Sequence, residues 1–314
     1  MATKFKTLEK ILNSGDFAIT AEIPPPVSAG PLELESKIDL LKGSVHAINL
    51  TDNAGANAHM SSLAAASIVL KKGIDPIYQI TCRDRNRLAI QSDLMGASAL
   101  GIRNVLALGG DPIKSGNQPD AKAVFDVNAK TVLNIINDMN KKGLTMGGRE
   151  LATRSDFFPG AAAIVHDPIE NWKPAALEAK ASIGAKFVQT QFCYDSDVLK
   201  TYMKYIVDSG LSEKLYFLIG IGPLKSEKSA KWMRDKLFGT VIPEAILLRM
   251  EQAKDPIQEG IKICADLIDE FSEIPGISGV HMMAPRNLKA IAPVVEKAVR
   301  NIISDHGYYD DAIL

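Results

Sequence analysis

Residues 76–112, PIYQITCRDRNRLAIQSDLMGASALGIRNVLALGGDP, contain one full copy of the pattern that decides the fold. An apolar run, Pro76–Cys82, is followed by an amphipathic window, Asn86–Leu100, which ends at Gly101. A second apolar run, Asn104–Leu108, comes directly after it. Because glycine after the last helical turn is typical of a left-handed helix terminus, the stretch predicts a strand, a helix and a parallel second strand.

The same alternation extends along the whole chain. Several of the runs are apolar throughout, which is typical of strands that are covered on both faces. The eight runs are Asp16–Ile23, His46–Thr51, Pro76–Cys82, Asn104–Leu108, Phe158–Val165, Phe187–Phe192, Leu215–Ile221 and Gly279–Met283. Other helical windows end at Gly73, Gly184 and Gly210, and three windows separate the last two runs. Eight strand–helix units predict an α/β protein with a single (β/α)₈ TIM barrel over residues 1–314.

A doubly wound open sheet is the competing fold. It would need a reversal of strand order and usually has fewer strands. Neither Gly-x-Gly-x-x-Gly nor Gly-x-x-x-x-Gly-Lys-Ser/Thr follows any run, and GIGPLK at Gly220 lacks the third glycine. The polar, Gly-rich residues 141–156 are expected to form a loop, and no linker of Pro/Ser/Gly character divides the chain. One barrel is the simpler prediction.

Composition argues against several functional classes. The chain has 36 Lys+Arg and 37 Asp+Glu with no basic tract, so we expect no nucleic-acid partner. No window reaches the roughly 18 apolar residues of a membrane span. The N-terminus is predicted to form an amphipathic helix (Phe5, Leu8, Ile11, Leu12) and not a signal peptide, so we expect a cytoplasmic protein. Three widely spaced cysteines indicate neither a disulfide framework nor a zinc ribbon.

Catalytic residues of such barrels lie at the carboxyl ends of the strands. Glu22 ends the first run among apolar residues and before three prolines, which predicts partial burial and suits a general acid near neutral pH. The alternative is a structural carboxylate paired with Arg83 or Arg85. Asp111, between Gly110 and Pro112, is either functional or a turn cap. Gln191 lies inside an apolar run, where its amide needs a partner or a ligand.

The remaining candidates favour structural interpretations. Cys82 and Cys193 are expected to be buried thiols, because no histidine is placed as an obvious base. His281 is expected to be a hydrogen-bonded interior histidine. With no His-x-x-x-His or His-Glu-x-x-His, we expect no metal site.

Seven strand-end motifs occur in one order along the chain. They are AEIPPP (21–26), LTDN (50–53), ITCRDRNR (80–87), LALGGDP (106–112), TQFCYD (190–195), GIGPL (220–224) and GVHMM (279–283). Together they resemble the methylenetetrahydrofolate reductases over about residues 16–305. The third and fourth motifs are most similar to the branch found in bacteria with a folate-based one-carbon pathway. The resemblance implies a (β/α)₈ barrel that uses FAD to reduce 5,10-methylenetetrahydrofolate to 5-methyltetrahydrofolate.

The resemblance also implies roles for individual residues. Glu22 matches the general acid that opens the five-membered ring, Asp111 the aspartate beside the flavin N1–C2=O edge, and Gln191 the glutamine that faces flavin and pterin. Gln79 stands where many members carry a histidine. The positions implied to contact the flavin are Thr51, Gln79, Gly110, Asp111, Ala163 and Lys180.

For cofactor and partners, the resemblance implies FAD in preference to FMN and a folate substrate. Electrons would come from NAD(P)H or from a separate partner subunit, as in some members of the branch. A homo-oligomer is compatible with it, and the regulatory extension of animal members is not expected. Two alternatives stay open: a flavin-free, pterin-binding barrel lyase or methyltransferase, and a non-catalytic barrel subunit of a larger reductase complex.

Overall fold

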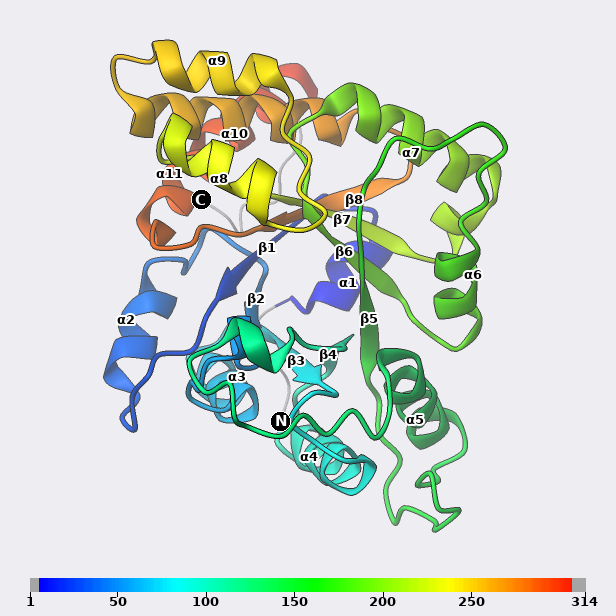
Figure 1. The fold of residues 1–314 in the computed structure, drawn as a ribbon. Coiled ribbons are helices and arrows are strands. Elements are labelled where there is room, and N and C mark those ends of the chain that lie inside the picture. The colour runs from blue at the N-terminus through cyan, green and yellow to red at the C-terminus, as the bar shows by residue number, and fades with distance from the viewer. Residues whose placement is uncertain (1–5, 307–314) are drawn as a thin grey trace.

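The computed structural model describes residues 6–306 and shows eight parallel strands closed into a barrel (Figure 1). Each strand pairs with the next one in sequence, and β8 pairs with β1. The strands are β1 (Ala18–Ile23), β2 (Ala47–Leu50), β3 (Asp75–Thr81), β4 (Asn104–Leu108), β5 (Phe158–Ala163), β6 (Phe187–Phe192), β7 (Tyr216–Ile221) and β8 (Ile277–Met282). This closed order confirms the (β/α)₈ prediction and excludes the open sheet.

Helices surround the barrel (Figure 1). In chain order, three of them come between β7 and β8, as the sequence predicts. Within residues 6–306 the structure has α1 (Leu8–Asn13), α2 (Leu32–Asp39), α3 (Ser62–Lys71), α4 (Arg87–Ala99), α5 (Ala129–Lys141), α6 (Ala175–Ser182), α7 (Ser196–Asp208), α8 (Glu227–Lys236), α9 (Glu244–Gln252), α10 (Pro256–Ser272) and α11 (Ile291–His306). Short 3₁₀ turns are η1 (Ala54–Ala56), η2 (Ile113–Ser115), η3 (Leu211–Glu213) and η4 (Leu288–Ala290). None of the helices over this range has the length and apolar content to span a bilayer.

Local sequence sets the helix ends. Asp195 caps α7 by accepting hydrogen bonds from the backbone N–H groups of Asp197 and Val198. After α7, Gly210 takes a left-handed conformation with φ of +71°. The glycines predicted to follow three other helices, Gly73, Gly101 and Gly184, also have positive φ, at +83°, +84° and +107°. These helix-ending glycines are therefore confirmed.

The barrel interior is mainly apolar at the end where the strands begin. Seven inward-facing residues form this layer with three residues of α1, which closes the same end: Ala18, Ala47, Ile77, Leu106, Phe158, Phe187 and Leu218 with Leu8, Ile11 and Leu12. The rings of Phe158 and Phe187 stack at a centroid distance of 5.5 Å. Gly160 is required beside them, because a Cβ atom there would lie 2.3 Å from the Phe187 ring. Phe5, predicted to belong to the first helix, lies outside the described residues.

Two residues further along β1, β2, β3 and β6, and at the same level on β8, the interior becomes polar. Because side chains alternate along a strand, this second layer faces the same space as the first. Its members are Thr20, Asn49, Gln79, Gln189 and His281, all of them buried. The polar layer lies between the apolar layer and the mouth of the barrel, where the strands end.

Asp75, at the start of β3, fixes α1 to the barrel, since its carboxylate accepts a hydrogen bond of 2.8 Å from the Leu8 backbone N–H. Burial raises the pKa of Asp75 to about 6. The unfolded chain therefore releases this proton at lower pH than the folded one, and stability falls as pH rises from about 4 to about 6.

The Asp75→Asn variant cannot ionise at this position. We expect its stability relative to the parent to rise by about 2–3 kcal/mol between pH 4 and pH 7 in urea unfolding; a constant difference would contradict this.

Candidate active site

Glu22 lies at the carboxyl end of β1, and its side chain is 24% exposed, in agreement with the predicted partial burial. The side-chain amide of Gln79, on β3, donates a hydrogen bond of 3.2 Å to Glu22 Oε2. His281 Nε2, on β8, lies 3.8 Å from the same oxygen. Two neighbours therefore hold one oxygen of the carboxyl group, and among the described residues none bonds to Oε1.

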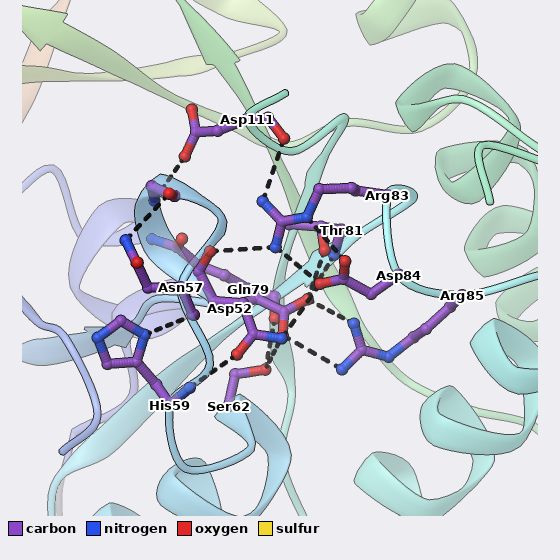
Figure 2. A network of polar contacts seen from close by, with 12 residues as sticks. Asp52, Asn57, His59, Ser62, Gln79, Thr81, Arg83, Asp84, Arg85 and Asp111 are labelled. Carbon is purple, nitrogen blue, oxygen red and sulfur yellow. Dashed lines mark hydrogen bonds and ion pairs between the residues drawn. The ribbon is translucent and has the colours of Figure 1, made fainter. Parts of the chain in front are cut away.

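The alternative pairing of Glu22 with an arginine is wrong, because both arginines bind other carboxylates. Arg85 donates to Asp52 Oδ2 at 2.6 Å (Figure 2). It also donates to Asp93 Oδ2 at 2.8 Å. The Asp52 side chain is 2% exposed, and it also accepts two hydrogen bonds of 2.8 Å from the backbone and hydroxyl of Thr81. This network holds the segment after β2 to the segment after β3.

Arg83 makes a second set of contacts and is 1% exposed. It binds Asp84 through two hydrogen bonds of 2.7 Å each, and it donates to the backbone carbonyls of Asn53, at 3.0 Å, and Asp111, at 3.3 Å (Figure 2). The cluster at residues 82–87 lies at the mouth, as predicted. Arg83 and Arg85 nonetheless bind carboxylates and backbone carbonyls of the loops around the mouth. Their charges are therefore already paired.

Asp111 joins two neighbouring loops. Its Oδ2 accepts a hydrogen bond of 2.8 Å from the backbone N–H of Gly55, in the turn η1 after β2 (Figure 2). Asp111 therefore caps the turn η1. Among the described residues, no group donates a hydrogen bond to its second oxygen, Oδ1. Gly110 precedes it with φ of +99°, and a Cβ atom there would lie 2.9 Å from the Arg83 Cβ. Only glycine lets the backbone pass so close to Arg83.

Two residues that are predicted to contact the cofactor, Thr51 and Lys180, have polar groups that lack a partner. The Thr51 hydroxyl, just after β2, is buried and has no hydrogen-bond partner in the part of the chain that the structure describes. Lys180, on α6, donates a bond of 2.7 Å to the carbonyl of Ala162, beside Ala163 at the end of β5. Among the side chains of residues 6–298 no carboxylate pairs with this ammonium, and burial lowers its pKa. A hydroxyl without a partner and a cation without an anion fit a phosphate-bearing flavin.

Gln191 lies near the end of β6, where the pairing with β7 shifts register between Gln189 and Phe192. Its Oε1 accepts a hydrogen bond of 3.0 Å from the backbone N–H of Phe192. The structure thus brings Glu22 and Gln79 into contact, while among the described residues no hydrogen bond or ion pair links Gln191 or Asp111 to Glu22. All of them lie at strand ends, on one face of the barrel.

His281 proves to be an interior histidine with bonding partners. Its Nδ1 lies 3.0 Å from the Thr20 hydroxyl and 3.3 Å from the side-chain nitrogen of Gln189. Its neighbours Thr20, Asn49 and Gln189 were not among the predicted site residues. Their positions could have indicated a role. Each lies two residues before a predicted site residue (Glu22, Thr51 or Gln191) and therefore faces the same side of its strand.

The cysteines are free and buried. Burial raises the pKa of Cys82 to about 11 and that of Cys193 to about 12, so neither thiol is ionised near neutral pH. Among the side chains that the structure describes, those of residues 6–298, no group of three His, Cys, Asp or Glu is arranged to hold a metal ion.

The fold and site define a (β/α)₈ barrel with a half-buried carboxyl group at its mouth and an unpaired cation near the end of β5. The family model for methylenetetrahydrofolate reductase matches residues 7–299, and the chain belongs to this family. Methylenetetrahydrofolate reductase 1 of Schizosaccharomyces pombe is 25% identical over 305 residues, which cover 92% of this chain and 46% of the relative. A probable NADPH-dependent reductase of Caenorhabditis elegans is 25% identical over 280 residues, covering 83% of this chain and 40% of that protein. The chain therefore spans less than half the length of these curated relatives.

Among solved structures, an uncharacterised protein of Clostridium thermocellum that binds two copies of 5-methyl-5,6,7,8-tetrahydrofolic acid is similar, with a TM-score of 0.66 and 16% identity. The match covers 94% of this chain and 99% of that one. DmoA of Hyphomicrobium sulfonivorans gives a TM-score of 0.56 at 9% identity, covering 94% of this chain and 88% of DmoA. At these low sequence identities, the structural similarity establishes the shared fold alone.

Proposed function

We propose that this barrel reduces 5,10-methylenetetrahydrofolate to 5-methyltetrahydrofolate, with bound FAD as hydride carrier and Glu22 as general acid. The observation that carries the proposal is the carboxyl group of Glu22 at the end of β1, whose Oε2 accepts a hydrogen bond from Gln79 and lies 3.8 Å from His281 Nε2. The activity named for its relatives supports the reaction, and the methyltetrahydrofolate bound by the Clostridium protein supports a folate ligand.

Glu22 supplies the proton that the reaction needs before any hydride moves. Opening the five-membered ring breaks a carbon–nitrogen bond, and the departing nitrogen must be protonated as the electron pair returns to it. The methylene carbon is left as an iminium cation on the other nitrogen. The carboxylate that Glu22 becomes then opposes this positive charge. A flavin, when bound, supplies the hydride that converts the iminium carbon to a methyl group.

The flavin would be held at the ends of β2, β4 and β5. Thr51 offers its unpartnered hydroxyl, and Lys180 offers its unpaired charge to a phosphate. Gly110 lets a ligand approach the backbone closely, and the Asp111 carboxylate would disfavour negative charge on a reduced flavin nearby. We assign Gln191, together with Glu22, to the folate.

The Lys180→Met variant tests this assignment of the cofactor site. It keeps the apolar stem of the side chain and removes the charge, so we expect FAD to bind about tenfold more weakly or worse. Fluorescence titration of the apoprotein with FAD measures the change. Lys130→Met, on the exposed face of α5, is the matched control and is expected to bind FAD as the parent does. Equal affinities of parent and Lys180→Met would remove Lys180 from the site.

We further propose that the protein works in the cytoplasm, where its three free cysteines stay reduced. Its electrons come from NAD(P)H or from a partner subunit, and one assay separates these donors. Turnover of the isolated chain with NADH or NADPH indicates a direct donor. Turnover with a reduced viologen dye alone indicates a partner.

The direct test of the function uses the full chain after incubation with FAD. We expect a yellow protein whose flavin absorbance is bleached when 5-methyltetrahydrofolate is added without oxygen, because that reaction is the reverse of the proposed one. A protein that binds no flavin and does not oxidise the folate contradicts the proposal. Tight folate binding without flavin would favour the lyase or methyltransferase alternative.

A further inference from the structure

Strand β6 carries a bulge at the point where it reaches the mouth of the barrel. Its pairing with β7 passes directly from Gln189 to Phe192, so Thr190 and Gln191 of β6 lie opposite a single residue of β7, Ile219. An extra residue of this kind bends a strand locally and places the side chains beside it. The position of Gln191 at the mouth therefore depends on the contacts that hold this bulge.

The hydroxyl of Thr190 holds the bulge through two hydrogen bonds. It accepts one of 2.8 Å from the backbone N–H of Gly220 on β7, and it donates one of 2.9 Å to the backbone carbonyl of Gln191. The direction of both bonds is fixed, because a backbone N–H only donates and a carbonyl only accepts. Thr190 is 3% exposed, so water has little access to this hydroxyl. Its single proton is already committed to Gln191.

Glycine at position 220 lets the two strands meet at the bulge. A Cβ atom there would lie 2.3 Å from the carbonyl oxygen of Thr190 and 2.6 Å from that of Gln191. The backbone of Gly220 therefore lies directly against the bulge, and the short side chain of Thr190 reaches its N–H group. The glycine and the hydroxyl together hold one conformation of residues 190 and 191.

The side-chain amide of Gln191 has a fixed orientation in this conformation. Its Oε1 accepts the backbone N–H of Phe192 at 3.0 Å, and only the oxygen of an amide can face such a donor. Both oxygens of Gln191, in its backbone and its side chain, thus have donors within residues 190–192. Among the described residues no group accepts a hydrogen bond from Nε2. This half-buried residue therefore offers a hydrogen-bond donor to a ligand at the mouth.

We propose that Thr190 is a positioning residue that acts on the folate through Gln191. Its hydroxyl holds the bulge so that the amide oxygen of Gln191 stays on Phe192 and the amide nitrogen faces an acceptor atom of the folate ring system. The inference rests on the proposed function, in which Gln191 contacts the folate. A role confined to the sheet would lower the free energy of unfolding and leave the folate affinity of the folded protein unchanged.

Single-turnover kinetics separate these two roles. Thr190→Val keeps the shape of the side chain and removes the hydroxyl, whereas Thr190→Ser keeps the hydroxyl. Mixing the FAD-loaded chain with 5-methyltetrahydrofolate without oxygen gives a half-saturating concentration and a limiting rate of flavin bleaching. In Thr190→Val we expect the concentration to rise about tenfold and the rate to stay within about threefold, because a contact made equally in the bound and transition states affects binding alone. Thr190→Ser should bind as the parent does, and equal affinities of Thr190→Val and the parent overturn the inference.

A double variant tests whether Thr190 acts through Gln191. Gln191→Leu removes the amide, so adding Thr190→Val to it should change the half-saturating concentration less than about twofold. A further rise of about tenfold would mean that Thr190 affects the folate by another route, which contradicts the inference. Thr7→Val is the matched control, because Thr7 is a buried threonine whose hydroxyl accepts a backbone N–H in the cap of α1, at the opposite end of the barrel. It should leave the folate affinity unchanged.

NMR relaxation tests the positioning without turnover. In the full chain labelled with ¹⁵N in its glutamine side chains, the Gln191 signal is the one lost in Gln191→Leu. For the ligand-free parent we expect an order parameter of about 0.85, the value of a rigid group, and for Thr190→Val one below about 0.6. A mobile Gln191 amide in the parent overturns the inference even if Thr190→Val does not fold. A parent that fails to react with the folate contradicts the proposed function instead, and the relaxation data then decide the role of Thr190.

Discussion

Replacing Glu22 by Gln is expected to slow methylenetetrahydrofolate reduction about 10³-fold, within the range that a positioned general acid contributes. The amide has the size of the carboxyl group and can still meet Gln79, but it has no acidic proton for the departing nitrogen. Reduction of bound flavin by the electron donor requires no such proton, and its rate should stay within about twofold of the parent's. Rapid mixing under anaerobic conditions measures the two half-reactions separately.

Glu33→Gln provides the control for this experiment, since Glu33 is an exposed carboxylate of α2 that pairs with Lys37 on the surface. It should leave both half-reactions intact. Equal losses in the two half-reactions of Glu22→Gln would show that Glu22 supports the flavin site and not the acid step. Thermal unfolding of each variant checks that the fold is retained.

The second large effect concerns stability. In Arg85→Met the buried carboxylate of Asp52 loses its counter-charge, and removing one partner of such a pair costs about 3 kcal/mol or more. We expect the free energy of unfolding, measured in urea, to fall by about that amount. Arg87→Met, which removes an exposed pair with Asp126, should change it little.

A double variant separates lost charge from lost packing. Adding Asp52→Asn to Arg85→Met removes the uncompensated charge, while Asn still accepts a hydrogen bond from Thr81. The double variant should therefore be more stable than Arg85→Met alone. If it is less stable, the contribution of Arg85 lies in packing against its neighbours and not in neutralising Asp52.

The barrel could be predicted because its evidence is local. The strand–helix units carry their own period, and four of them a predicted terminal glycine; Asn104–Leu108 and Phe187–Phe192 match the observed strands residue for residue. Each of the other six strands differs by one or two residues at one end or at both. Bounds shift there because the last apolar residues of a run, such as Ile164 and Val165, can pack equally well from a loop.

The contacts within the site could not be predicted in the same way. Asn49 and Gln189 are 140 positions apart and meet only because the sheet closes on itself. Arg83 and Arg85 were possible partners of Glu22, yet Asp84 and Asp52 pair with them, and Asp126 pairs with Arg87. Which carboxylate pairs with an arginine depends on the geometry of the loops, and the periodic pattern of the sequence does not determine that geometry.

The apolar layer beneath the polar one has a consequence for proton traffic. Phe158 and Phe187 stack across it and α1 closes the end beneath, and among the described residues no hydrogen bond joins the polar layer to Asp75 or α1. We therefore expect protons to reach Glu22 from the mouth, the side where the substrate enters in the proposed reaction. In the proposed reaction the acid is recharged after the product leaves, so its reprotonation is coupled to product release.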